Sequence, residues 1–278
     1  MLIVFCAMIG MFMAWNTEAS QPFSLQLFFW ATLGIAMLSA AAAVVNCLIE
    51  KQIDAKMART AWRPLPSGNL STNQTLIFAI LLGAIGFILL ITFVNSITAY
   101  LTLATFAGYA FLYTVVLKPL TPQNIVIGGA SGAMPPVLGW AAVNGSVSPE
   151  AWLLFLIIFV WTPPHFWALA LYRVDDYKRT GLPMLPVTHG SKFTRLQILL
   201  YASLLFPVAL SPVLVGMSSY FYLVVSSVAT IYFIILCWKL YIEYSERTAR
   251  YVFRYSIYYL SLVFAGLIVD KLVMQLFL

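Results

Sequence analysis

Charge is what this sequence has least of. Asp, Glu, Lys and Arg together make up 9% of its 278 residues, while 62% of the residues are hydrophobic. A soluble domain carries about 25% charged residues, so the composition excludes an ordinary soluble protein. Apolar runs of about twenty residues recur along the chain, and the alternating pattern of transmembrane strands is absent. The sequence therefore predicts an all-α polytopic membrane protein.

Cysteine is also scarce, which limits the kinds of site that the chain can build. Cys6, Cys47 and Cys237 lie in or beside apolar segments and show no C-x-x-C spacing. This pattern favours packing over a disulfide or a cysteine metal site. The net charge of +6 is attributed to membrane orientation, and we expect no nucleic-acid partner.

Nine apolar segments predict about nine transmembrane helices in one intramembrane domain that covers residues 1–278. The first segment is short and begins at Met1 with no basic flank, so we expect the natural start to lie upstream. The predicted spans cover residues 1–15, 25–47, 74–94, 97–117, 124–143, 151–172, 197–217, 219–241 and 255–277.

The positions of Lys and Arg predict the orientation of these spans. Fourteen of the fifteen lie in or beside the loops after the second, fourth, sixth and eighth spans, and only Lys271 lies on the other side. Positive residues accumulate on the cytoplasmic side of a membrane. We therefore expect those loops and the N-terminus in the cytoplasm, and the C-terminus outside.

A cluster of polar residues follows the second span. Asn46, Glu50 and Asp54 have i, i+4, i+8 spacing, which places them on one face of a helix. Arg59 and Arg63 repeat the spacing of four residues. A solvated helix end is the ordinary interpretation of charges at such a position, but solvation alone requires no shared face.

A second cluster ends the sixth span and resembles the first. It contains Arg173, Asp175, Asp176 and Lys178, and a proline-rich turn follows, as Pro64 and Pro66 follow the first cluster. An even number of spans separates the two, so both are predicted to be cytoplasmic. Carboxylates bind Mg²⁺ while leaving positions for phosphate oxygens, and Arg grips phosphates bidentately. Together with an apolar bundle, this combination indicates a membrane-embedded prenyltransferase that uses a prenyl diphosphate.

Two long motifs carry a resemblance to a known family. The stretch NCLIEKQIDAKMARTAWRPLPSG, residues 46–68, resembles an N-x3-D/E-x3-D-x4-R-T-x2-R-P-L block of the UbiA superfamily of intramembrane prenyltransferases. The stretch WTPPHFWALALYRVDDYKRTGLPMLPVTHG, residues 161–190, is similar to the P-H-F-x-A-L and D-Y-x3-G-x-P-M-L-P-V blocks of its haem-modifying branch. Two features depart from the pattern: Glu50 replaces the Asp of many members, and the usual basic segment before the first span is missing. The resemblance implies a bundle of nine helices with two acidic cytoplasmic loops.

The resemblance also implies roles for individual residues. Glu50, Asp54 and Asp176 would bind Mg²⁺, the only cofactor expected, with Asp175 a weaker candidate. Asn46 would assist them, and His165 would take a haem-binding or catalytic role, although a lone buried His is often only hydrogen-bonded. The residues expected to hold the diphosphate are Arg59, Arg63, Arg173, Tyr177 and Lys178.

The implied activity is transfer of a farnesyl group from farnesyl diphosphate to a vinyl group of haem B, with addition of water, in a bacterial inner membrane. Expected partners are farnesyl diphosphate, haem B, the lipid bilayer and other proteins of haem A or oxidase assembly. Three alternatives stay open at this point. One is a related enzyme that prenylates a quinone precursor, the second is a cation-coupled secondary transporter, and the third is a non-catalytic haem-handling assembly factor.

Overall fold

A computed structural model describes residues 2–15, 24–57 and 60–277 of the chain. The regular elements within these ranges are all helices. The chain divides into two compact units. The first comprises Met1–Val147 with Asp175–Pro183, and the second comprises Ser148–Val174 with Met184–Leu278.

Eight helical segments among the described residues are long and apolar enough to cross a membrane, and Leu2–Ala14 is a shorter apolar helix. Each of the nine predicted spans therefore coincides with a helix. The largest differences are at two N-termini, where the helices begin at Gly190 and Glu246, several residues before the predicted starts. Those first turns carry charged residues, which a search for uncharged runs omits although a helix accommodates them.

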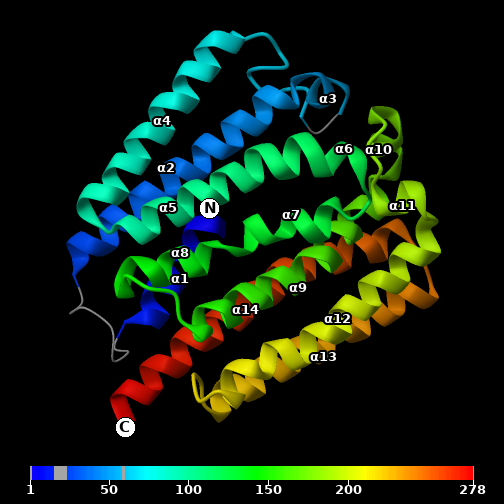
Figure 1. The fold of residues 1–278 in the computed structure, drawn as a ribbon. Coiled ribbons are helices and arrows are strands. Elements are labelled where there is room, and N and C mark those ends of the chain that lie inside the picture. The colour runs from blue at the N-terminus through cyan, green and yellow to red at the C-terminus, as the bar shows by residue number, and fades with distance from the viewer. Residues whose placement is uncertain (1, 16–23, 58–59, 278) are drawn as a thin grey trace. The chain divides into compact units, whose positions relative to one another are not determined.

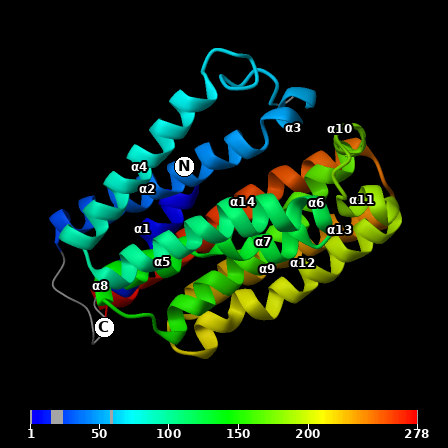
Figure 2. The same ribbon diagram turned by 45° about the horizontal axis from the view of Figure 1, so that its top comes forward.

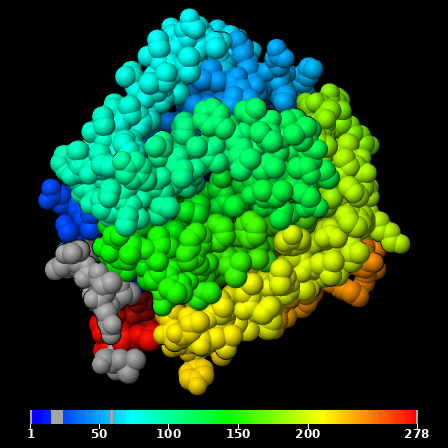
Figure 3. Space-filling model, in the orientation of Figure 1, coloured from blue at the N-terminus to red at the C-terminus, as the bar shows by residue number. Residues whose placement is uncertain are grey.

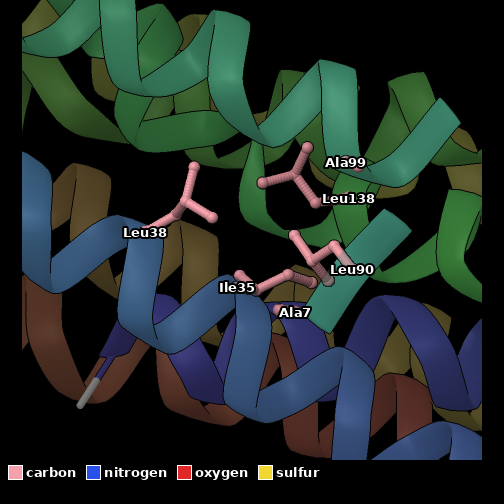
Figure 4. Packing of buried hydrophobic residues seen from close by; sticks show 6 residues of the cluster. All are labelled: Ala7, Ile35, Leu38, Leu90, Ala99 and Leu138. Atoms are coloured by element: carbon pink, nitrogen blue, oxygen red, sulfur yellow. The ribbon is translucent and has the colours of Figure 1, made fainter. Parts of the chain in front are cut away.

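The first unit is built around α1 (Leu2–Ala14), α2 (Leu25–Ile49), α4 (Thr72–Phe93), α5 (Ser96–Ala107) and α8 (Pro135–Asn144). Helix α2 packs along α4, and α1 packs against α8 (Figure 1). Their contact residues include Ala7, Ile35, Leu38, Leu90, Ala99 and Leu138, which form a buried apolar cluster (Figure 4). By contrast, α4 carries exposed apolar side chains such as Ile77, Phe78 and Leu81, and its cyan atoms lie on the surface in Figure 3. Such a face is suited to lipid contact.

Small residues set the distance between α1 and α8. A Cβ atom added to Gly10 would lie 2.0 Å from the carbonyl oxygen of Pro136, and one added to Gly139 would lie 1.9 Å from that of Ala7. The two backbones therefore approach as closely as in other membrane helix pairs with small interface residues. The predicted fifth span is interrupted at Met134, where helix α7 (Asn124–Ala133) ends and Pro135 begins α8.

The span Ser96–Leu120 is not a uniform α-helix. Helix α5 continues into a π-helix, η1 (Gly108–Leu117), and then into the single turn α6 (Lys118–Leu120). A π-helix adds a residue to the turn and rotates everything that follows it. Two short helices complete the first unit: α3 (Lys51–Lys56), directly after α2, and most of α10 (Val174–Thr180).

The second unit contains α9 (Pro149–Tyr172), α11 (Leu185–Thr188), α12 (Gly190–Leu214), α13 (Tyr220–Ile242) and α14 (Glu246–Phe277). Helix α9 packs against α12 and α14, and α13 packs against both of these, as Figure 2 also shows for α12 and α13. Asp270 of α14 joins two of these helices at the N-terminus of α13. Its carboxylate accepts hydrogen bonds from Ser218 Oγ at 2.8 Å, from Ser219 N at 2.6 Å and from Tyr222 N at 3.2 Å, and another from Ser219 Oγ.

Candidate active site

The acidic face predicted from spacing is present in the first unit. Asn46 lies in α2, Glu50 lies at the junction of α2 and α3, and Asp54 lies in α3. The junction hardly interrupts the helical ladder, because Glu50 N donates to Asn46 O at 2.9 Å and Asp54 N donates to Glu50 O at 2.8 Å. All three residues are buried, Glu50 and Asp54 with only 5% and 3% exposure. Their spacing thus brings two carboxylates and an amide to one buried side of the chain.

Each of these buried carboxylates is paired with a basic side chain from another segment. Arg63 Nη1 donates to Asp54 Oδ2 at 2.6 Å, and Lys118 Nζ donates to Glu50 Oε1. Burial lowers the pKa of Arg63, but the hydrogen bond to Asp54 and the nearby charges raise it more, so this pKa lies above its ordinary value. Arg63 is therefore a permanent cation, and the two ion pairs leave this part of the site close to neutral.

The π-helix η1 places three further groups at the same site. Thr114 Oγ1 donates to Tyr109 O at 2.9 Å, five residues back, and accepts from Asn46 Nδ2 at 3.0 Å. Tyr109 and Tyr113 stack with ring centroids 5.5 Å apart, and Lys118 Nζ lies 5.9 Å from the centroid of Tyr113. The added residue of η1 thus directs Thr114, Tyr113 and Lys118 towards the residues of α2.

The second acidic cluster contributes one buried carboxylate. Asp176 and Tyr177 of α10 are buried, and Arg179 Nη2 donates to Asp176 Oδ1. Tyr113 interacts electrostatically with both Glu50 and Tyr177, which links α10 to the acidic face of α2 within the first unit. Asp175 is different, because its side chain is 87% exposed and lies 3.9 Å from Lys178 Nζ.

The remaining sequence candidates have different surroundings. Arg59 lies outside the described residues. Lys178 is exposed, and Arg173 is an exposed residue whose guanidinium stands 5.9 Å from the ring centroid of Tyr172. His165 belongs to α9 in the second unit, where its Nδ1 lies 2.6 Å from Ser256 Oγ.

Sequence reasoning missed the partners on the other side of the site. The orientation rule accounts for Lys118 as one of the fourteen cytoplasmic basic residues, and the sequence predicts no role for Thr114, Tyr109 or Tyr113. Asn46 and Thr114 are 68 positions apart in the sequence, and a local sequence pattern cannot predict a contact over that separation. The only sequence feature that points to this side of the site is Lys118, a basic residue at the end of an apolar span. The orientation rule already explains a basic residue at that position.

The site offers the right donor atoms for Mg²⁺ but no preformed cage. Among the residues that the structure describes, no three His, Cys, Asp or Glu side chains converge to hold a metal ion. Mg²⁺ is commonly held by one or two carboxylates together with substrate phosphates. Glu50, Asp54 and Asp176 fit that mode in chemistry and burial, since each is a carboxylate now neutralised by a movable basic side chain.

Comparison with known proteins identifies the family. The model of the UbiA prenyltransferase family matches residues 3–263. The chain belongs to this family. Two bacterial proteins named protoheme IX farnesyltransferase are close relatives over 97% of this chain. The one from Albidiferax ferrireducens is 59% identical, with 90% of its length covered, and the one from Leptothrix cholodnii is 60% identical, with 88% covered.

Solved UbiA-type structures share the fold at low sequence identity. A digeranylgeranylglyceryl phosphate synthase superposes with a TM-score of 0.80 at 20% identity, over 97% of this chain and 92% of that one. A UbiA homologue from Archaeoglobus fulgidus, bound to DMAPP and Mg²⁺, has a TM-score of 0.65 at 15% identity, over 95% of both chains. These likenesses establish the UbiA fold for a multi-pass membrane protein of this prenyltransferase family.

Proposed function

We propose that this chain transfers the farnesyl group of farnesyl diphosphate to a vinyl group of haem B. The observation that carries the proposal is the 57–60% identity, over 97% of the chain, to bacterial proteins named protoheme IX farnesyltransferase. The bond between the farnesyl C1 and the diphosphate oxygen breaks, and the diphosphate leaves with the electron pair. C1 then joins one vinyl carbon, water adds to the other, and a proton is released, so the product carries a hydroxyethylfarnesyl chain.

The paired charges of the first unit support a role in diphosphate departure. Glu50 is paired with Lys118, Asp54 with Arg63 and Asp176 with Arg179. We infer that the three basic side chains turn to the phosphate oxygens when the substrate binds, which frees the carboxylates. Oriented cations of this kind stabilise negative charge that develops on a leaving group.

The freed carboxylates of Glu50, Asp54 and Asp176 would hold Mg²⁺ against the diphosphate. When bound, Mg²⁺ supplies charge neutralisation for the departing oxygen. The Archaeoglobus fulgidus homologue bound to DMAPP and Mg²⁺ supports this use of the metal in the family. Arg59, Arg173, Tyr177 and Lys178 stay predictions as further diphosphate ligands, and Asp175 stays a weaker one for the metal.

The stacked tyrosines of η1 are suited to the other charge of the reaction. Loss of diphosphate builds positive charge on the allylic carbon, and aromatic faces attract a cation. Tyr109 and Tyr113 lie beside the Glu50 and Lys118 pair, where the diphosphate is expected. Their rings would therefore border the farnesyl C1 rather than the distal prenyl units.

The proposed setting is the cytoplasmic membrane of a bacterium. The substrates are farnesyl diphosphate and haem B. The helices lie in the lipid bilayer, and the acidic clusters face the cytoplasm. Contact with other proteins of haem A or oxidase assembly also remains a prediction.

An activity assay tests the proposal. The full chain, purified in detergent, is incubated with farnesyl diphosphate, haem B and Mg²⁺, and released diphosphate is measured beside the haem product. We expect both to appear together and both to disappear when EDTA removes the metal. Release of diphosphate at the same rate in EDTA would contradict the metal role, and farnesyl diphosphate left intact with Mg²⁺ present would contradict the function.

A further inference from the structure

His165 is held on three sides in the second unit. Its ring stacks on Trp161 with centroids 4.3 Å apart and on Phe253 with centroids 4.7 Å apart. Its Nδ1 lies 2.6 Å from Ser256 Oγ. Ser256 is fully buried, and its main-chain oxygen accepts a hydrogen bond from Trp161 Nε1 at 2.7 Å. The ring is thus clamped on both faces and on its Nδ1 edge.

The surroundings of Ser256 determine which nitrogen of His165 carries the proton. Ser256 Oγ also lies 2.6 Å from the carbonyl oxygen of Phe253, which can only accept a hydrogen bond. A hydroxyl has a single proton, so Ser256 donates that proton to Phe253 O. Nδ1 of His165 must then donate to Ser256 Oγ, because two lone pairs at 2.6 Å would otherwise face each other. Neutral His165 is therefore protonated at Nδ1, and its Nε2 keeps a lone pair.

That lone pair is not used by the protein. Apart from Ser256, the described residues supply no hydrogen-bond partner to His165, whose side chain is only partly buried. A histidine that binds a metal through one nitrogen almost always donates its other N–H to a fixed acceptor, which sets the tautomer and the ring orientation. Among the described residues, the ring contacts of His165 are with aromatic side chains and include no acidic or basic one.

We propose that Ser256 is a positioning residue that fixes His165 as the Nδ1–H tautomer, so that Nε2 binds the iron of a haem substrate. The proposal rests on the proposed function for the identity of the substrate. His165 would act as an axial imidazole ligand of the haem iron, as histidine does in several haem proteins. Haem would then be oriented from α9 and α14, because a hydrogen-bond chain runs from His165 Nδ1 through Ser256 Oγ to the carbonyl oxygen of Phe253.

The tautomer is tested without any haem. The chain has only two histidines, His165 and His189, so ¹⁵N-histidine labelling of the full protein gives a simple spectrum that His165→Gln assigns. We expect wild-type His165 to be protonated at Nδ1, Ser256→Ala to shift it towards the Nε2–H form, and Ser256→Thr to restore the wild-type pattern. Ser261→Ala is the matched control, since Ser261 makes the same kind of bond to Ile257 O without touching a histidine. An Nε2–H wild type, or a tautomer unchanged in Ser256→Ala, would overturn the proposal.

The ligand role is tested by titrating the full protein with protohaem and, separately, with metal-free protoporphyrin IX. Loss of a partner of a metal ligand typically costs 10- to 100-fold in metal affinity. We therefore expect Ser256→Ala to weaken protohaem binding by about 10-fold and to leave protoporphyrin binding unchanged, while His165→Gln abolishes the shift of the Soret band that imidazole ligation of the iron produces. Equal losses for both porphyrins would mean a merely structural effect and would overturn the proposal. Neither titration needs farnesyl transfer, so failure of the proposed function is recognised separately, by the absence of product.

Discussion

Asp54 is the carboxylate that the site shields most completely, and its pairing with Arg63 suggests a direct test at the scale of one residue. Asp54→Asn preserves the shape but removes the charge that would bind Mg²⁺. Loss of one such electrostatic contribution costs about 100- to 1,000-fold in turnover. We expect a loss of this size in the rate of haem product formation. The protein should stay folded with only a modest fall in melting temperature, because Arg63 is 30% exposed and water can solvate it when its partner is lost.

Glu246→Gln is the control for the Asp54 variant. Glu246 is an exposed carboxylate on α14 whose partner is Arg250 on the same helix, at 3.0 Å. Its conversion to an amide should leave turnover and melting temperature almost unchanged. Near-normal turnover in folded Asp54→Asn would contradict the metal role of Asp54.

The pair between Glu50 and Lys118 makes a prediction about stability. The two side chains are only 6% and 15% exposed, and removal of one member of a buried pair costs about 3–5 kcal/mol, because a buried charge is left without compensation. We expect Lys118→Met to lower the free energy of unfolding by about this amount in detergent. The double variant with Glu50→Gln should recover most of the loss.

The exposed pair of Glu246 and Arg250 again provides the comparison. Exposed ion pairs contribute between about 0 and 1 kcal/mol, so Arg250→Met should change the unfolding free energy by less than 1 kcal/mol. If Lys118→Met were equally mild, Glu50 would have another partner and our account of the charge pairing would be wrong.

At the scale of elements, the π-helix η1 makes the site possible. Each residue of a helix advances it by about 100°, so deletion of the exposed Val115 should convert η1 to an α-helix and rotate Lys118 away from Glu50. We expect a protein that inserts into the membrane but has lost at least about 100-fold in turnover. Val115→Ala, which keeps the residue count, should retain normal turnover. A deletion variant with wild-type activity would show that the register of η1 does not matter.

A second element-scale prediction concerns Asp270, which caps α13 from a distant helix. Its carboxylate accepts four hydrogen bonds from the segment 218–222. Hydrogen bonds to a charged group contribute about 1.5–3 kcal/mol, so Asp270→Ala should destabilise the protein by about 3 kcal/mol. Ser218→Ala removes one of the four donors and should cost about 1 kcal/mol. Equal unfolding free energies for Asp270→Ala and the wild type would contradict this capping role.

Elements were predictable from the sequence where one dominant force decides them. Apolar runs located the spans, although the first is short and the last includes Asp270 and Lys271, and the four-residue spacing located the buried face of Asn46, Glu50 and Asp54. The π-helix was not predictable, since the apolar pattern of 108–117 suits an α-helix equally well. The ion pairs of Lys118 and Asp176 were also missed, because the first depends on packing between distant segments and Asp176 was expected to face a metal ion rather than Arg179.

At the scale of the whole molecule, the distribution of basic residues predicts the orientation in the membrane. Fourteen of fifteen Lys and Arg residues mark the same side, so a reporter fused after Leu278 should lie outside the cytoplasm. Alkaline phosphatase at that position should be active, and green fluorescent protein should be dark. A reporter placed in the loop after Leu120 should give the reverse result. Fluorescence at the C-terminal fusion would contradict the predicted orientation.

The central claim concerns the acceptor of the prenyl group, and a competition experiment tests it most directly. The purified full chain receives farnesyl diphosphate, Mg²⁺, haem B and an aromatic quinone precursor together, in water enriched in ¹⁸O, and the products are analysed by mass spectrometry. We predict a single product, haem B that has gained one farnesyl group and one hydroxyl group labelled with ¹⁸O. A farnesylated quinone precursor beside unmodified haem B would contradict the account.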